Sequence, residues 1–270
     1  MNPHSWLSRL CGFACAGLIA AFSLTGCGKS KSSITLAGST AFQPFAEKLA
    51  EKYMLINPAV NVTVQGGGSA VGIQAALSGA ADIGMADLVN LPPEAEGLRS
   101  VVVAKDGIVV VVHPSNQAAG LTLDQVRGIF DGTIKDWKQV GGAAAGITVV
   151  SREAGSGTRT SFEQIIGNVR LTDNAIIQDS NGTIRETVAN DANAIGYLSH
   201  GLLNDKIKAL TIDGVACTPE EIMLGRYRLV RPIFLLTRSE PKGDLAGFID
   251  YMLSPDAQKI LQTSGLIPAK

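Results

Sequence analysis

The residues best suited to chemistry lie in the stretch Ser151–Arg159, which reads Ser-Arg-Glu-Ala-Gly-Ser-Gly-Thr-Arg. Arg152 stands four residues before Ser156, and Ser156-Gly157-Thr158 is expected to begin a helix. The first backbone N–H groups of a helix have no intrahelical partner and carry the positive end of the helix dipole. Glycine lets an anion approach that backbone, hydroxyl groups add donors, and arginine adds a planar charged fork. The stretch therefore predicts an anion-binding site.

Two other expected strand-to-helix turns contain the same residue types. Gly38-Ser39-Thr40 precedes a helix expected over residues 41–56, and Gly67-Gly68-Ser69 precedes one expected to end near Leu77. For any single turn, a capping serine or threonine with glycine for the turn geometry is the simpler explanation. Three such turns in one chain, one of them with an arginine nearby, favour anion binding, provided that the turns meet in space.

Asp87, which ends the segment Asp82-Ile83-Gly84-Met85-Ala86-Asp87, narrows the class of anion. A carboxylate repels an anion unless that anion carries a proton to donate. Monohydrogen phosphate carries one, whereas sulfate near neutral pH does not. Asp87 would then reject sulfate through an unpaired acceptor and like-charge repulsion, at a cost of roughly a few kcal/mol. The alternative is that Asp87 caps or salt-bridges a surface turn.

Three further residues near these turns have competing interpretations. Arg152 could instead form a surface salt bridge with Glu153 or Glu163. Arg159 competes for the ligand role, but its place on the first helical turn favours pairing with a nearby acid. Asn181 stands at another glycine-containing turn, just before the helix expected from residue 183, and is a candidate to reach the same cleft.

The first 26 residues have the features of an export signal. Arg9 precedes the apolar run 10–22, which is too short to span a membrane comfortably. Leu24-Thr25-Gly26-Cys27 resembles the lipobox of bacterial lipoproteins, which implies that Cys27 becomes a lipidated N-terminus anchored in a membrane. An ordinary export signal or an uncleaved anchor is the alternative. Residues 27–33 are then expected to be the lipidated cysteine and a flexible polar tether.

The remainder of the chain excludes several classes of function. Removing 26 of 270 residues leaves 244, and loss of Arg9 leaves 22 basic against 24 acidic residues, a net charge of −2. This balance, without any basic run, argues against nucleic acid as a partner. Only Cys27 and Cys217 remain, so a lipidated Cys27 leaves no disulfide within the chain. His113 and His200 lie in no Cys/His cluster and are expected to be structural, so no metal site or cofactor is expected.

Hydrophobic periodicity predicts alternating strands and helices. Strands are expected over 34–38, 60–64, 82–85, 99–104, 107–113, 147–150, 194–198 and 231–237, and helices over 41–56, 69–77, 122–130, 157–166, 183–189, 243–253 and 255–264. This alternation predicts an α/β architecture with ligands at the carboxyl ends of the strands. The chain length, with Pro114 and Pro232, indicates two lobes with crossings near 112–115 and 229–232.

In their order along the chain, these motifs resemble the phosphate-binding lipoproteins of bacterial phosphate ABC importers. The resemblance runs from about Ile34 to Lys270 and includes Asn193–Tyr197 and Ser254–Lys259 besides the turns described above. It implies an α/β, two-lobed periplasmic-binding-protein fold of type II, which closes about a hinge on a ligand in the cleft between the lobes. Lobe I is expected over 34–113 and 231–270, and lobe II over 114–230.

The resemblance also implies a set of ligand-binding residues from both lobes. The first lobe would supply Ser39, Thr40, Ala41, Ser69 and Asp87, and the second would supply Arg152, Ser156, Gly157 and Thr158. Two positions depart from the family pattern. Ala41 stands where some members have an aromatic residue, which here follows as Phe42, and Ala86-Asp87 stands where many short members have Ser-Arg.

The function expected from the resemblance is that of a receptor, not an enzyme. Such a protein captures inorganic phosphate outside the cytoplasm, as a lipid-anchored monomer of the cell envelope, and delivers it to the permease subunits of an ABC importer. One alternative is a receptor for sulfate, molybdate or tungstate. Another is a phosphatase or serine hydrolase that uses Ser156, but neither His113 nor His200 lies in a nucleophile-elbow context to activate it.

Overall fold

The computed structural model describes residues 31–269, so the predicted signal peptide, Cys27 and most of the predicted tether lie outside the described residues. Strand β1 (Ser32–Gly38) begins two residues before its predicted start. Ser32 and Ser33, which were expected in the tether, pair instead with Val60 and Asn61 of β2 (Val60–Gln65). The chain therefore joins the sheet at Ser32, the second of the described residues.

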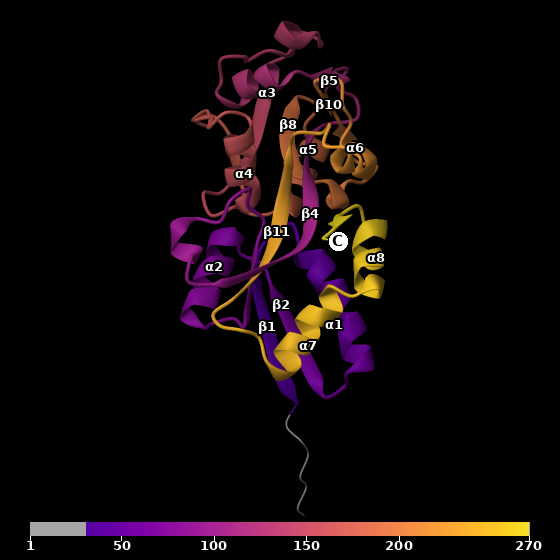
Figure 1. Cartoon of the computed structure of the whole chain (residues 1–270). Coiled ribbons are helices and arrows are strands. Elements are labelled where there is room, and N and C mark those ends of the chain that lie inside the picture. Colours follow the sequence, from indigo (N-terminus) through magenta and orange to yellow (C-terminus); the bar gives the residue numbers. More distant parts are fainter. Residues whose placement is uncertain (1–30, 270) are drawn as a thin grey trace, which may run out of the picture. The chain divides into compact units, whose positions relative to one another are not determined.

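The first lobe is a sheet with helices on both faces (Figure 1). Its strand β1 pairs in parallel with β2 and with β3 (Ile83–Ala86). One face is covered by α1 (Gln43–Ile56), α7 (Gly243–Met252) and α8 (Pro255–Thr263), and the other by α2 (Ser69–Ser78). Because Phe45, Leu49 and Tyr53 recur at helical spacing, α1 buries one apolar stripe against the strands.

The second lobe has its own core. Its strands are β6 (Thr148–Arg152), β7 (Ile176–Gln178) and β8 (Ala194–Ser199), and its helices are α3 (Leu123–Phe130), α4 (Gly157–Ile165), α5 (Asn181–Asn190) and the short α6 (Pro219–Met223). The core includes Phe130, Phe162 and Tyr197, and the rings of Phe162 and Tyr197 stack with centroids 4.0 Å apart. These aromatic contacts fix α4 against the sheet that carries Arg152 at its end.

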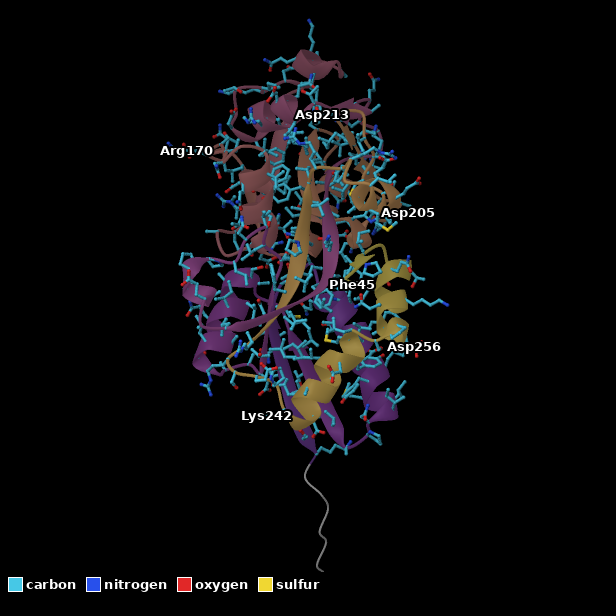
Figure 2. All side chains as sticks on the ribbon, in the orientation of Figure 1. Phe45, Arg170, Asp205, Asp213, Lys242 and Asp256 are labelled. Carbon is cyan, nitrogen blue, oxygen red and sulfur yellow. The ribbon has the colours of Figure 1, made fainter. Side chains whose placement is uncertain are left out.

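Several short elements complete the chain. The short strands are β5 (Gly120–Leu121), β9 (Lys208–Ala209), β10 (Thr211–Ile212) and β12 (Ile267–Pro268), and the 3-10 turns are η1 (Pro93–Ala95), η2 (Trp137–Val140) and η3 (His200–Leu202). Figure 2 shows the labelled charged residues Arg170, Lys242 and Asp256 at the surface, whereas Phe45 is buried. Within residues 31–269, no helix has the length and apolar character needed to cross a membrane.

Two long strands connect the lobes. The prediction of separate strands over 99–104 and 107–113 is wrong, because β4 (Arg99–Val112) is continuous. It pairs in antiparallel fashion with β11 (Val230–Thr237), and both strands run between the lobes in Figure 1. The polar break at Asp106 does not end the strand, since Asp106 stays in the ladder opposite Arg231. A buried charge pair, not a turn, interrupts the apolar pattern.

The same two strands show where one core gives way to the other. On β4, Ala104 belongs to the first core and Ile108 to the second, which is earlier in the chain than the expected crossing near 112–115. Leu229, which directly precedes β11, belongs to the second core, and Ile233 on β11 belongs to the first. The full limits of the lobes, 34–113 with 231–270 and 114–230, stay a prediction.

Candidate anion-binding site

The three turns expected to bind an anion lie together between the lobes. The backbone N–H of Ala70 donates to the carbonyl of Gly155 at 3.1 Å, which joins the start of α2 to the turn before α4. Asn181 Nδ2 donates to Thr40 Oγ1 at 3.2 Å, which joins the start of α5 to the first turn. The turns follow the carboxyl ends of β1, β2 and β6, where the α/β architecture was expected to place a ligand. The meeting in space that the anion-site hypothesis required is therefore present.

Glycines permit this close approach of the two lobes. A Cβ atom on Gly157 would lie 2.1 Å from Ser69 Oγ and 2.7 Å from Asp87 Oδ1, so only glycine fits there without displacement. Gly68 has a φ of 89° and would place a Cβ 2.8 Å from the carbonyl oxygen of Gly155. These glycines therefore allow the two lobes to come into contact, in addition to allowing the turns to form.

Asp87 is buried at this contact, with 1% of its surface exposed. Ser69 Oγ donates to Asp87 Oδ1 at 2.6 Å, and Thr158 Oγ1 donates to Asp87 Oδ2 at 3.2 Å. The backbone N–H of Asp87 donates in turn to Ser69 Oγ at 3.0 Å. The alternative of a cap or salt bridge in a surface turn is therefore wrong, because the carboxylate lies inside the molecule among groups of both lobes.

Sequence reasoning missed the main partner of Asp87, which is Arg231. Arg231 Nη1 lies 2.5 Å from Asp87 Oδ2, and Arg231 Nη2 lies 2.8 Å from Asp106 Oδ2. Ser199 Oγ donates to Asp106 Oδ1 at 2.8 Å, and all four residues are buried. Burial raises the pKa of Asp106 above its ordinary value, although the charge of Arg231 opposes this. The available signal was a charged residue in a mainly apolar strand, Asp106 beside Lys105 in β4 and Arg231 in β11.

Arg152 is buried rather than at the surface, with 1% of its surface exposed. Its Nε and Nη2 each donate to a carboxylate oxygen of Glu153 at 2.8 Å, and Nη2 also lies 3.2 Å from the carbonyl oxygen of Asp179. The expected pair with Glu153 exists, but it uses only one side of the guanidinium. Among the described residues, Arg152 Nη1 is the one buried side-chain nitrogen or oxygen without a hydrogen-bond partner. A buried charged donor of this kind requires an acceptor.

The backbone adds further donors. No acceptor within residues 31–269 contacts the N–H groups of Thr40, Ala41, Ser69, Gly157 or Thr158. Ser156 is the N-cap of α4, since its Oγ accepts from the N–H of Arg159 at 3.2 Å, which confirms the capping interpretation for this turn. A capping oxygen still keeps its own hydrogen to donate. Capping and anion binding are therefore compatible at Ser156.

Ser39 differs from its neighbours because its backbone is already satisfied. Its N–H donates to the carbonyl of Met85 at 2.9 Å, and its Oγ accepts from the N–H of Phe42 at 3.1 Å. Ser39 can therefore offer an anion its hydroxyl hydrogen but not its N–H group. The next two residues, Thr40 and Ala41, supply the open N–H groups of this turn.

The two residues of uncertain role have distinct surroundings. Arg159 pairs with Glu163 at 2.7 Å and donates to the carbonyl of Arg152 at 2.9 Å, so its expected pairing with a nearby acid is confirmed. Asn181 is fully buried, and its Oδ1 accepts from the N–H of Ser199 at 3.1 Å. With Nδ2 on Thr40, Asn181 reaches the cleft and bonds across it.

The formal charges around the site do not by themselves attract an anion. Arg152 and Arg231 are positive, whereas Glu153, Asp87 and Asp106 are negative, so the sum is two minus three, or −1. An anion must therefore be held by N–H groups, hydroxyl groups and helix N-termini at short range. A cavity of about 220 Å³ opens beside Ser69 and Gly157, with both lobes in its wall, but neither Arg152 nor Asp87 lines it.

Comparison with known proteins identifies the family of this chain. Residues 25–256 match the family model of the PBP superfamily domain. The phosphate-binding protein PstS of Bacillus subtilis is 36% identical over 249 residues, which cover 89% of this chain and 82% of that protein. This chain belongs to the PstS family. The resemblance inferred from the order of the sequence motifs is confirmed.

Similarity to solved structures confirms the α/β, two-lobed periplasmic-binding-protein fold. A phosphate ABC transporter substrate-binding protein from Clostridium perfringens, solved with bound phosphate, is 38% identical with a TM-score of 0.86 and covers 88% of this chain and 100% of its own. An ABC-type phosphate transport receptor from Vibrio cholerae is 35% identical with a TM-score of 0.74, and the match covers 87% of this chain and 99% of the receptor. Both relatives are named for transport and not for catalysis.

Proposed function

We propose that this PstS-family protein captures inorganic phosphate outside the cytoplasm and delivers it to the permease subunits of an ABC importer. The observation that carries the proposal is Arg152 Nη1, a buried cationic donor without a hydrogen-bond partner among the described residues. The names of the relatives from Bacillus subtilis and Clostridium perfringens support phosphate as the ligand.

The proposed contacts come from both lobes. Thr40, Ala41, Gly157 and Thr158 donate through backbone N–H groups, Arg152 donates through Nη1, and Ser69 donates through its N–H group because its hydroxyl is engaged by Asp87. The hydroxyl groups of Ser39 and Ser156 complete the set. These eight donor groups would surround an anion shielded from water, enough for roughly micromolar or tighter affinity.

Asp87 gives the reason to favour phosphate over other oxyanions. Its carboxylate already accepts from Ser69, Thr158 and Arg231. An ionised carboxylate in contact with an anion needs a proton from that anion. Monohydrogen phosphate has a proton, whereas sulfate, molybdate and tungstate are fully ionised near neutral pH. We therefore place Asp87 as the acceptor of the phosphate proton.

A hydrolytic function for Ser156 has less support. Its hydroxyl caps α4, and each described histidine is engaged elsewhere: His113 Nδ1 with Ser115 Oγ at 2.7 Å, and His200 Nδ1 with the carbonyl of Gly265 at 3.1 Å. A serine nucleophile needs an adjacent base. A receptor that is not an enzyme therefore fits this site better.

The proposal includes a place in the cell envelope. Lipidation at Cys27 would anchor the protein, a monomer, to a membrane. Closure of the lobes on phosphate would create the surface that the permease recognises. Mass spectrometry of the full chain purified from bacterial membranes tests the anchor. Detection of an acylated Cys27 at the N-terminus is expected, and an intact residue 1 would contradict it.

Calorimetric titration of the chain from Gly28 onward tests the ligand. Phosphate is expected to bind at roughly micromolar affinity or tighter near neutral pH, with sulfate at least about a hundredfold weaker. Asp87→Asn should reduce this ratio more than it reduces phosphate affinity. Equal binding of both anions would refute the assignment of phosphate, and steady hydrolysis of a phosphate monoester would refute the receptor.

A further inference from the structure

A buried network of three charges connects the site to the strands that join the lobes. Arg231 on β11 and Asp106 on β4 are paired directly in the ladder. Arg231 reaches Asp87 through Nη1 and Asp106 through Nη2 and Nε, and each of the three residues is at most 1% exposed. Neither Arg231 nor Asp106 contributes to the proposed set of phosphate ligands. Their burial, at a cost in desolvation, needs another explanation.

We propose that Arg231 is a positioning residue that sets the selectivity for phosphate over sulfate, and that Asp106 limits this effect by sharing the arginine. The proposal deepens the proposed function and rests on it. Arg231 acts through Asp87 and does not touch the anion itself.

The physical argument concerns the proton that sulfate lacks. Sulfate can bind without an unfavourable contact only if Asp87 first takes a proton from solvent and becomes a donor. A guanidinium nitrogen 2.5 Å from Asp87 Oδ2 in a buried site holds that carboxylate as an acceptor, and sulfate has no proton to donate to an acceptor. Removal of the cation removes this contact and admits sulfate.

Asp106 acts in the opposite direction. It takes two nitrogens of the same guanidinium, at 2.8 and 3.3 Å, and places a second negative charge near Asp87. Both effects make an additional negative charge on Asp87 less favourable. Without the Asp106 carboxylate, Arg231 would form its ion pair with Asp87 alone. The two substitutions are therefore expected to change selectivity with opposite signs, which a merely structural role would not produce.

The test measures the ratio of sulfate to phosphate dissociation constants by calorimetric titration near neutral pH. Arg231→Met should lower the ratio at least about tenfold, and Asp106→Asn should raise it. Arg231→Lys, which keeps a cation, should recover part of the ratio. Arg226→Met removes an exposed arginine paired with Glu221 and is the matched control, with no expected change.

Thermal unfolding without ligand identifies variants that fail to fold. If Arg231→Met fails because it leaves two unpaired carboxylates, the double variant Arg231→Met/Asp106→Asn removes one of them and should still show the low ratio. Equal weakening of both anions in the folded variant, or changes of the same sign for Arg231→Met and Asp106→Asn, would overturn the proposal. If the unchanged protein binds neither anion, the proposed function fails too, whereas normal phosphate selectivity insensitive to Arg231 refutes only the role of Arg231.

Discussion

Arg152 and Glu153 are neighbours in the chain and also form a two-point pair, with Nε and Nη2 of the arginine each 2.8 Å from a carboxylate oxygen of Glu153. This pair uses one edge of the guanidinium and leaves Nη1 without a partner. Glu153 therefore fixes the orientation of the arginine while cancelling most of its charge. The arrangement offers an anion a directed hydrogen bond rather than a strong field.

Replacement of Arg152 by Met should weaken phosphate binding by roughly tenfold to a hundredfold, the range for loss of a hydrogen bond to a charged group. Calorimetric titration measures the change. Arg170→Met is the control, because that arginine is 89% exposed and pairs with Asp173 at the surface. Unchanged affinity in the Arg152 variant would show that Nη1 does not contact the ligand.

Gly157→Ala should reduce phosphate affinity by at least about tenfold, because its Cβ would collide with Ser69 Oγ and Asp87 at the contact between lobes. Gly155→Ala is a matched control two residues away, where the nearest contact of a Cβ is an ordinary 3.5 Å to Ala70. Binding measurements on both variants check this. Similar losses in the two variants would contradict a steric requirement specific to Gly157.

The stability of the protein should depend on pH through Asp106. Burial raises its pKa above the ordinary value of 3.8, against the opposing effect of Arg231. Asp87, Cys217 and Tyr227 are the other titratable groups coupled to it. The folded protein therefore holds this proton more tightly than the unfolded chain, so this group's contribution to stability is greatest below pH 3.8 and falls as the pH rises through the raised pKa.

The measurement is Tm as a function of pH for the unchanged protein and for Asp106→Asn. As the pH rises from about 4 towards neutral, the unchanged protein should lose stability relative to the variant. The slopes matter rather than the absolute values, because the substitution also changes the surroundings of Arg231. Parallel curves would mean that Asp106 titrates as an ordinary carboxyl in the folded protein.

Cys217 should react slowly with thiol reagents while the protein is folded. The residue is 7% exposed, and burial raises the pKa of its thiol, so little thiolate is available near neutral pH. In the chain from Gly28 onward it is the one remaining cysteine. Mass spectrometry after alkylation should show labelling that is at least about a hundredfold faster in denaturant. Fast labelling of the native protein would indicate local opening around α6.

Local patterns in the sequence were sufficient for much of the fold. Helix α1 and strand β8 followed from apolar spacing, and the helix start after Ser156 followed from hydroxyl residues beside glycine. Helix α5 begins at Asn181, two residues before its predicted start at residue 183. These features are set by contacts between residues a few positions apart. The short strands β9 and β10 have no such signal, because two residues are too few for a period.

The donor-rich turns, the acid at Asp87 and the placing of Arg152 beside Glu153 depend on residue type and near neighbours, so they could be predicted from the amino-acid order alone. The burial of Asp87, the unpaired nitrogen of Arg152 and the link from Asp87 through Arg231 to Asp106 depend on the packed fold. Arg231 and Asp106 are 125 positions apart. Their meeting depends on the register of β4 against β11, which is fixed by the packing of two cores and not by any local pattern.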